Sequence, residues 1–510
     1  MYIVHTPDYI HFTLRDEIGG AEGPTYTDAR LFAGILHGDM VTIWDDRDPA
    51  IELISRAKHP ALAGVLELAS KTLYGMTSRN VPIYLFRPFD RRYPPFRVGC
   101  SERDRTHNRL AIVQFEDWAK GLTLPRGVLV QLLGPTGDFG IEQVALQHTA
   151  SPFWSHKAFM GHPMHMAAPV GRPLLDTAGG WTLCNVDPVG CRDIDDVIGF
   201  RGDQVAICIA DVDAAVHEDS AVDRYAALTA QTIYENGFAV RPMLPPVLSE
   251  GICSLVPGEI RPAIALIATI RDGSLCDVHF KAVNILNGRS YTYEEADADL
   301  GDLFKPLVGA LGCVSDDSHM WIAEAMKFYN LEAAKVLVAR GHGILRSHSG
   351  PKAEKLAALI PALGPEIAAR FASEAAAYVP VGGATHFGMD DKPYCHATSP
   401  IRRYADLVNQ RILKGVAPTV PNWQLYYTLN VRSKAAKEYE RAVTFMHAIN
   451  SGNKEVDAVI VDSDRAYVPA WSRLIRLAND KAVGSECRVR YFYDASKARW
   501  KERMIFEITN

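Results

Sequence analysis

The chain has 510 residues, of which 48% are hydrophobic and 22% charged, and its formal net charge is −6 at pH 7. This length suffices for three or four domains. The negative charge excludes a protein that coats nucleic acid by bulk electrostatics, because such binding needs an excess of Lys and Arg. No apolar run is long enough to span a bilayer, and the first residues lack a secretion signal. We therefore expect a cytoplasmic protein that does not bind membranes, with the nucleus as the alternative compartment.

The first third of the chain consists of short strand-like runs broken by turns. Residues 128–133, for example, are apolar except for Gln131, and a Gly-Pro-Thr-Gly turn follows them. This pattern predicts small β-barrels. Strand-like runs at residues 205–210 and 263–270 then surround a helical stretch at residues 221–234, which predicts an α/β segment.

Apolar positions recur at helical spacing later in the chain, over residues 317–342, 352–376 and 401–413. After residue 453 the pattern returns to alternating strands, at residues 458–461, 488–493 and 504–508. The end of the chain is therefore predicted to form a short β-module.

Four carboxylates lie within ten residues in the segment VDPVGCRDIDD, at Asp187, Asp193, Asp195 and Asp196. Carboxylates held together repel one another unless a cation or a basic partner offsets their charge. Pro188 and Gly190 permit a turn, and only a looped backbone would bring all four side chains to one place.

An acidic surface turn is the simplest alternative for an arbitrary chain. A calcium loop of the EF-hand type is another, but the spacing does not fit it. Oxygen ligands favour Mg²⁺, with Mn²⁺ as a substitute. The chemistry indicated is two-metal phosphoryl transfer, in which one ion activates water and the other stabilises the leaving 3′ oxygen. Asp195 would then be a ligand or would orient the water.

A second constellation is HATSPIRRYADL, residues 396–407. We predict that it begins a helix capped by Thr398 or Ser399, with Arg402 and Arg403 in the first turn. Arginine opposes the helix dipole there, which suggests an anionic neighbour such as a phosphate. The alternative is a surface pair between Arg402 and Asp406, which would contribute little.

These two motifs together resemble the catalytic domain of the RNase II (RNB) family, and in detail the exosome-associated eukaryotic type. Four further segments match the family in order: residues 207–216, 241–263, 290–296 and 343–351. The resemblance implies a multidomain α+β fold. Residues 1–75 and 76–165 would form cold-shock (OB) barrels, residues 170–450 an α/β RNB catalytic domain, and residues 454–510 a shortened S1-like barrel.

The family's activity implies a hydrolytic exoribonuclease that degrades single-stranded RNA from 3′ to 5′ and releases nucleoside 5′-monophosphates. By position, Arg402 matches the catalytic arginine, and Arg403 beside it is a further RNA-binding candidate. Tyr234 matches a tyrosine that stacks on the terminal base, and Tyr293 one that distinguishes ribose from deoxyribose. Glu438 and Glu440 both match a glutamate near the bound 3′ end.

The sequence also departs from the family. One extra residue separates Tyr234 from Pro242, and Ala323 precedes Glu324 where relatives often have two glutamates. A nuclease domain of the PIN type is not expected, and an RNA-decay assembly is compatible with the chain but not required. Two alternatives stay open: a non-catalytic RNA-binding protein of RNB fold, and a phosphatase or nucleotidyl transferase that uses the same metal chemistry.

Overall fold

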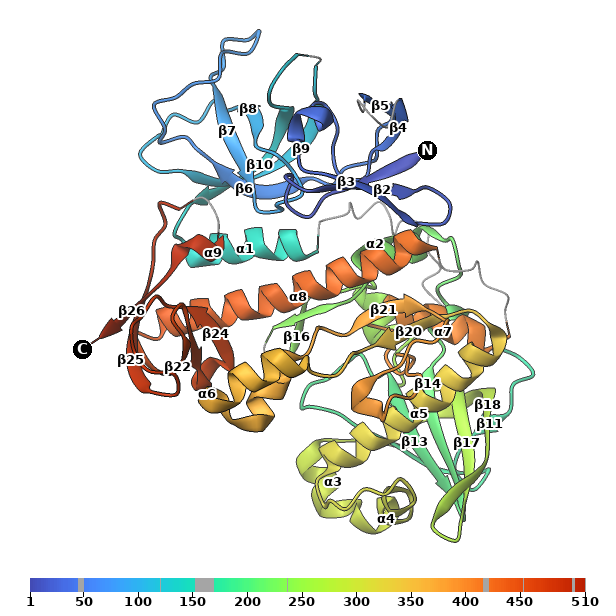
Figure 1. The fold of residues 1–510 in the computed structure, drawn as a ribbon. Helices are drawn as coiled ribbons and strands as arrows, with labels where there is room; N and C mark the ends of the chain where they lie inside the picture. Colours follow the sequence, from blue (N-terminus) through green and yellow to red (C-terminus); the bar gives the residue numbers. More distant parts are fainter. Residues whose placement is uncertain are drawn as a thin grey trace. The chain divides into compact units, whose positions relative to one another are not determined.

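The computed structural model describes residues 1–44, 50–119, 121–151, 169–235, 237–415, 422–452, 454–497 and 500–509 (Figure 1). The chain forms two compact units. Unit 1 comprises Met1–Phe153, Ala353–Ala372 and Ala435–Asn510, and unit 2 comprises Trp154–Lys352 and Ser373–Lys434. No helix within the described residues is long and apolar enough to cross a bilayer.

Unit 1 begins with a five-stranded antiparallel sheet in the order β3-β2-β1-β4-β5. Alternate side chains of its strands face one core, in which the rings of Phe12 and Phe32 stack with centroids 4.1 Å apart. The strands are β1 (Tyr2–His5), β2 (Phe12–Asp16), β3 (Glu22–Tyr26), β4 (Met40–Trp44) and β5 (Ala50–Ser55).

A closed barrel follows, with the strand order β10-β8-β7-β6-β9. Position 64 in β6 requires glycine, because a Cβ there would come within 2.2 Å of the Arg87 carbonyl oxygen on the paired strand β7. The first strand of the barrel in the chain is β6, which precedes residue 76. Residues 152–165 of the barrel domain predicted over residues 76–165 lie outside the described residues. The elements are β6 (Leu62–Leu66), β7 (Ile83–Pro88), β8 (Phe96–Gly99), β9 (Arg109–Asp117), β10 (Arg126–Pro135) and the following helix α1 (Phe139–Ala150).

The end of the chain forms a third five-stranded sheet in unit 1, in the order β24-β23-β22-β25-β26. The predicted strands at residues 458–461, 488–493 and 504–508 lie inside three of its members. Helix α6 (Ala353–Ala372) packs on β22 through Leu359 and Leu363. The strands are β22 (Glu455–Asp462), β23 (Arg465–Val468), β24 (Arg473–Arg476), β25 (Glu486–Tyr493) and β26 (Met504–Thr509), with α9 (Trp500–Arg503) before the last.

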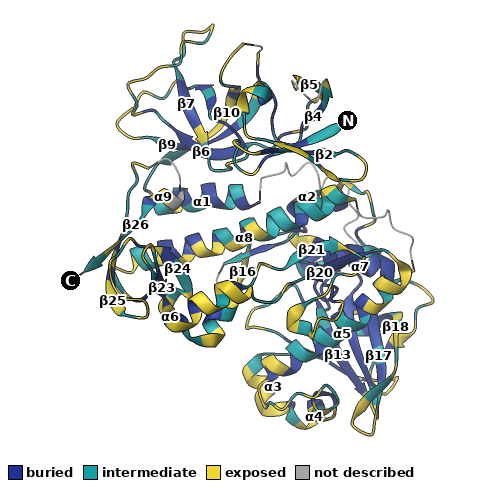
Figure 2. Cartoon of the chain, in the orientation of Figure 1, coloured by how far each residue is buried: buried dark blue, intermediate teal, exposed yellow. Residues whose placement is uncertain are grey.

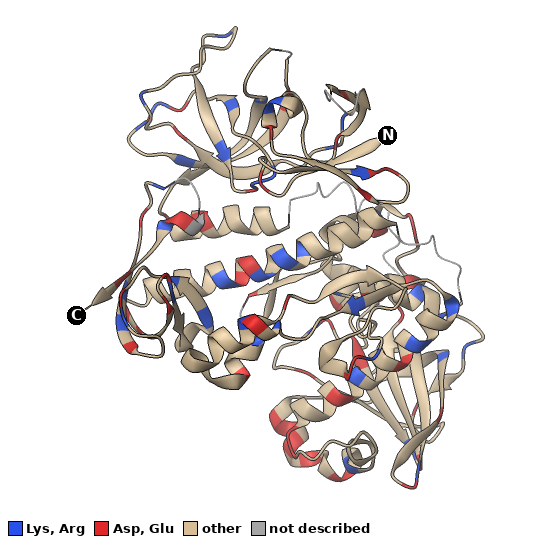
Figure 3. Ribbon diagram, in the orientation of Figure 1, with Lys and Arg blue, Asp and Glu red and all other residues tan. Residues whose placement is uncertain are grey.

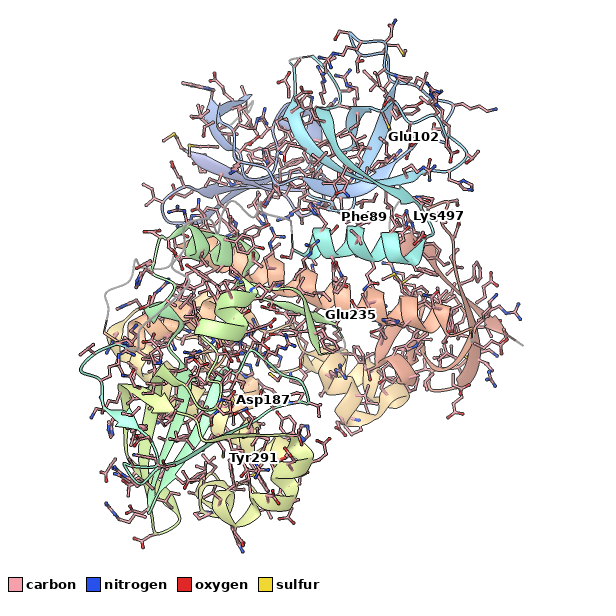
Figure 4. The ribbon with its side chains drawn as sticks, turned by 180° about the vertical axis from the view of Figure 1, so that it is seen from behind. Phe89, Glu102, Asp187, Glu235, Tyr291 and Lys497 are labelled. Carbon is pink, nitrogen blue, oxygen red and sulfur yellow. The ribbon has the colours of Figure 1, made fainter. Side chains whose placement is uncertain are left out.

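A fully buried ion pair connects this sheet to α1. Arg503 donates to Glu142, and both side chains are 0% exposed. Tyr493 donates its hydroxyl to the same Glu142 oxygen across 2.7 Å. Arg503 also lies against Phe89 and donates to the carbonyl of Lys497, and both of these residues are labelled in Figure 4.

Unit 2 is built on a seven-stranded sheet in the order β11-β18-β17-β14-β13-β12-β19. In β14, Ala206, Cys208 and Ala210 belong to one core, whereas Val205, Ile207 and Ile209 belong to the other. Both faces are therefore covered, which explains an uninterrupted apolar strand, and Figure 2 shows the neighbouring strands β13 and β17 as largely buried. The strands are β11 (Leu174–Leu175), β12 (Thr182–Val186), β13 (Asp196–Arg201), β14 (Gln204–Ala210), β17 (Ile260–Arg271), β18 (Ser274–Leu286) and β19 (Arg289–Tyr291).

Helices cover the two faces of this sheet. One core includes side chains of α2 and α7, and the other includes side chains of α4 and α5. The helices are α2 (Ala221–Thr229), α3 (Tyr293–Asp299), α4 (Gly301–Ala310), α5 (Ser318–Arg340), α7 (Tyr404–Leu413) and α8 (Trp423–Asn450), whose second half belongs to unit 1. Two small sheets complete unit 2, β15 (Ile233–Glu235) with β16 (Phe238–Arg241), and β20 (Ile344–Ser347) with β21 (Ala377–Pro380).

The helix predicted over residues 221–234 is too long. Helix α2 ends at Thr229, Ala230 adopts a φ of 65°, and Tyr234 lies in strand β15 instead. The left-handed residue ends the helix, and the backbone beyond it pairs with β16.

Candidate active site

The four aspartates lie on the connection between antiparallel strands β12 and β13. Asp187 follows the last residue of β12, Asp196 begins β13, and Gly190 turns the chain between them with a φ of 81°. Backbone hydrogen bonds hold both ends of this loop: the Asp187 N–H donates to the Tyr291 carbonyl across 3.0 Å, and the Ala210 N–H donates to the Asp195 carbonyl across 2.9 Å. Figure 4 shows Asp187 and Tyr291 close together.

Among the described residues, three of the four carboxylates accept hydrogen bonds from protein donors. Asp187 accepts from the Asn185 amide across 2.9 Å, and Asp193 accepts from the Tyr234 hydroxyl. Asp195 accepts from the Ile401 N–H and from Arg402 Nε, each across 3.0 Å. The loop thus collects the carboxylates, but it directs them toward different partners.

The electrostatics of the cluster show an excess of negative charge. Burial raises the pKa of Asp195 to about 7, although the Arg402 guanidinium opposes that shift. Burial also raises the pKa of Asp196 well above its usual range, and the charges of Asp187 and Asp195 add to the increase. These groups would ionise together only if further positive charge were supplied.

A divalent cation fits this donor set, because it consists of hard oxygen ligands with uncompensated charge. The side chains nevertheless do not meet at one point, as the sequence had led us to expect. In the part of the chain that the structure describes, no three Asp, Glu, His or Cys side chains converge closely enough to hold a metal ion. The physical reason is that Asp193 and Asp195 turn to Tyr234 and Arg402.

The segment that carries Arg402 is not helical, so the predicted placement of Arg402 and Arg403 in a first helical turn is wrong. Helix α7 begins at Tyr404, with Arg403 at the N-cap. The Thr232 N–H donates to the Arg402 carbonyl across 2.9 Å, and the Tyr404 N–H donates to the Ala230 carbonyl across 2.8 Å. This bridge to the strand-like segment after α2 replaces the helical hydrogen bonds.

The alternative considered for Arg402, a surface pair with Asp406, is not formed. Asp406 is fully buried and accepts from the Ser399 N–H across 2.8 Å and from Arg403 across 2.7 Å. Arg402 therefore points to Asp195. Burial disfavours the charge of Arg402, but the neighbouring Asp195 carboxylate outweighs it and raises the arginine pKa.

The two predicted tyrosines both follow the aspartate loop in the chain, and they take different partners. Tyr234 contacts Asp193 through its hydroxyl, as described above. Tyr293 begins α3, and its hydroxyl makes no hydrogen bond with any residue that the structure describes. Burial raises the pKa of Tyr293 to about 12, and the charges of Asp187 and Asp196 add to the shift.

Glu438 and Glu440 lie on the part of α8 that belongs to unit 1, whereas the aspartates belong to unit 2. Glu438 is half-buried and Glu440 is exposed. Their assignment to the 3′ end of RNA stays a prediction.

Several contacting residues were missed in the sequence. Asn185 could have been found, because in a strand it shares a face with Asp187 two positions later. Asp406 was considered only as a surface partner, since burial cannot be seen from spacing alone. No sequence signal indicated His319, whose ring stacks on Tyr293.

Comparison with known families assigns two domains. Residues 178–306 and 367–418 match the RNB domain, and residues 83–150 match the Dis3-like cold-shock domain 2. The chain therefore contains an RNB domain preceded by a cold-shock domain, and its resemblance to the RNB family is confirmed.

The curated relatives are RRP44/Dis3, RNase R and RNase II proteins. The chain is 26% identical over 465 residues to the probable exosome complex exonuclease RRP44 of Caenorhabditis elegans, covering 71% of this chain and 48% of the relative. It is 28% identical over 273 residues to ribonuclease R of Acidithiobacillus ferrooxidans, covering 49% of this chain and 58% of the relative. The chain thus spans about half the length of the RRP44 relatives that it matches.

Solved structures share the fold. Mycoplasma genitalium RNase R in complex with ribose methylated single-stranded RNA superposes with a TM-score of 0.73 at 17% identity, covering 100% of both chains. Yeast Ssd1, a pseudonuclease, superposes with a TM-score of 0.67 at 14% identity, covering 97% of this chain and 80% of that chain. The predicted multidomain α+β fold class is confirmed, while the domain boundaries stay a prediction.

Proposed function

We propose that the protein is a metal-dependent exoribonuclease that hydrolyses single-stranded RNA from 3′ to 5′ and releases nucleoside 5′-monophosphates. The observation that carries the proposal is the convergence of Arg402 with the aspartate loop, at Asp195, inside an RNB domain. An acidic surface turn would leave its carboxylates in water, whereas Asp195 is only 3% exposed and accepts a hydrogen bond from Arg402.

Proteins with this domain generally depend on a divalent cation, and we propose Mg²⁺ held by Asp187, Asp193, Asp195 and Asp196, with Mn²⁺ as a substitute. Such a cation would offset the charge of the carboxylates and of the attacked phosphodiester. Arg402 is half-exposed, so its guanidinium can pair with a phosphate oxygen while Nε remains on Asp195. Arg403, held by Asp406, keeps the Arg402 segment in place.

RNA recognition must be local, since acidic and basic side chains are interspersed over the chain (Figure 3). We propose that Tyr293 reads the terminal ribose, because its phenol hydroxyl, which has no hydrogen-bond partner among the described residues, can bond a 2′-OH. Tyr234 is proposed as the base-stacking residue, for which it would have to leave Asp193.

A second candidate is a non-catalytic RNA-binding protein. The bond from Tyr234 to Asp193 favours it, because that bond occupies a carboxylate that a cation would need. The two candidates differ in whether RNA is shortened after it is bound.

The deciding experiment incubates 5′-labelled single-stranded RNA, and DNA of the same sequence, with Mg²⁺ and either the wild-type protein or Asp195→Asn. We expect a shrinking RNA ladder with the wild type only, no shortening of DNA, and nucleoside 5′-monophosphates as the released product. RNA that stays whole with both proteins yet shifts on a gel would support the binding protein instead. Hydrolysis of small phosphate esters without shortening of RNA would indicate a phosphatase.

A further inference from the structure

Tyr293 and Asp187 leave neighbouring strands of the unit 2 sheet at the same end. Strand β19 pairs with β12 in parallel, and the last residues of the two strands, Tyr291 and Val186, are register partners. Parallel strands end at the same edge of a sheet, so the residues that follow them are neighbours. The phenol of Tyr293 is thereby placed beside the aspartate loop.

One face of the Tyr293 ring is covered by His319, the second residue of α5. The two ring centroids lie 3.6 Å apart, and the planes are inclined by 10°. This is a close, nearly parallel stack, and the His319 side chain is 62% exposed. The stack therefore stands at the surface of unit 2, where a ligand can reach it.

Three hydrogen bonds fix the position of this histidine. Asp317 accepts from the His319 N–H across 2.9 Å and from ring Nδ1 across 3.0 Å. Because a carboxylate accepts, Nδ1 carries the hydrogen. The buried Ser318 donates its hydroxyl to the Tyr293 carbonyl across 3.1 Å, which joins the start of α5 to the start of α3.

Helix α3 does not attract RNA electrostatically. The helix reads YEEADAD, and its carboxylates appear as a red band in Figure 3. A phosphate backbone would be repelled by this surface. Directional hydrogen bonding to a sugar hydroxyl remains, and it requires that the phenol be held in one orientation.

We infer that His319 is a positioning residue for ribose recognition: by stacking on Tyr293 it fixes the ring so that the phenol hydroxyl meets the 2′-OH of the terminal nucleotide. This inference rests on the proposed RNA-binding function, but not on hydrolysis. Without the stack, Tyr293 would rotate more freely about its side-chain bonds, and ordering the ring on binding would cost part of the hydrogen-bond energy.

The test measures binding in the Asp195→Asn chain with Mg²⁺, so that RNA is not consumed. Fluorescence anisotropy compares two labelled RNA oligonucleotides that differ only in a 3′-terminal ribose or 2′-deoxyribose. The discrimination ratio is the Kd for the deoxy end divided by the Kd for the ribose end. We expect a ratio of about tenfold in this parent chain, as for one hydrogen bond to a polar partner.

His319→Ala should reduce the ratio by about three- to tenfold, the range expected for loss of a ring pair. His319→Phe retains a flat ring and should keep the ratio within about twofold. In a Tyr293→Phe background, His319→Ala should change the ratio no further, because the hydroxyl that it orients is gone. His279→Ala, which changes an exposed histidine on β18 whose ring hydrogen-bonds the Asp277 carbonyl, is the matched control.

The inference is overturned if His319→Ala leaves the discrimination ratio unchanged. It is also overturned if His319→Ala changes the ratio as much in the Tyr293→Phe background as in the parent chain. A ratio near one in the parent also overturns it. Failure of the proposed exonuclease activity has a different signature, namely wild-type protein that never shortens RNA, and the binding ratio remains measurable in that case.

Discussion

Arg402 donates its Nε–H to Asp195 across 3.0 Å, although the two residues are 207 positions apart in the chain. The contact depends on two other features: the Ile401 N–H also donates to Asp195, and Asp406 engages the neighbouring Arg403. The arginine is thus oriented by the turn that carries it, and among the described residues the hydrogen bond to Asp195 uses Nε and not a terminal guanidinium nitrogen.

Replacement of Arg402 should affect turnover more than binding. We expect Arg402→Ala to lower kcat on single-stranded RNA by about 10²–10³-fold, the loss typical of one charge-stabilising donor. The Kd for RNA should rise by less than about tenfold, because the other contacts persist. Initial rates and anisotropy would measure both. Lys335→Ala, an exposed helix residue, is the control, and a loss confined to KM would contradict this role.

In the proposed metal site, Tyr234 would compete with the cation for Asp193. Removing its hydroxyl in Tyr234→Phe leaves that carboxylate without its phenol donor, so the affinity for Mn²⁺ should increase. A hydrogen bond to a charged group typically corresponds to a change of about tenfold or more in a binding constant. Isothermal titration of the RNA-free protein with Mn²⁺ measures this directly. Tyr293→Phe, whose hydroxyl has no described partner, is the matched control, and weaker Mn²⁺ binding by Tyr234→Phe would show that the phenol supports the site instead.

The parts of the site that could be predicted from sequence are those encoded in short segments. Asp187, Asp193, Asp195 and Asp196 share one loop, and Arg402 belongs to a motif whose match to the RNB family places it with them. The central strands were also visible, because burial on both faces leaves an uninterrupted apolar run such as residues 205–210.

Features that depend on distant backbone pairing were not visible. The start of α7 was misplaced because the bridge between Arg403 and Gln231 cannot be read from either segment alone. That Asp406 pairs with Arg403, and not with Arg402 as the alternative interpretation had it, also follows from this irregular turn. The orientation of the aspartate side chains also depends on Tyr234, which the sequence had placed at the end of a helix.

The buried pair of Glu142 and Arg503 should be essential to the stability of the C-terminal sheet. Arg503→Met leaves Glu142 charged and buried, which should destabilise the sheet by about 3–5 kcal/mol. The triple variant Glu142→Leu, Arg503→Met and Tyr493→Phe replaces all three polar partners. It should destabilise the sheet far less, because no buried charge is left. Hydrogen exchange of the β25 and β26 amides reports the opening free energy. Equal destabilisation by the single and the triple variant would contradict this account.

The first sheet should lose stability in mild acid because of two half-buried histidines. Burial lowers the pKa of His5 to about 4 and lowers the pKa of His37 well below its usual value of 6.5, and Arg92 adds to both shifts. His37 Nδ1 accepts from the Thr6 N–H across 3.1 Å, which requires a neutral ring. Asp90 opposes the shift of His37, whereas His59 reinforces it.

Since both folded-state pKa values lie below that of the unfolded chain, the unfolded state binds more protons once the pH falls below about 6.5. Their contribution to stability is therefore complete above that pH and is lost progressively as the pH falls from about 6.5 toward 4. Hydrogen exchange of the β1 and β2 amides, followed between pH 7.5 and 4.5, should show this loss. His37→Asn keeps an acceptor for Thr6 but cannot titrate, so it should make the dependence shallower. An equally steep dependence in that variant would assign the acid sensitivity to other groups.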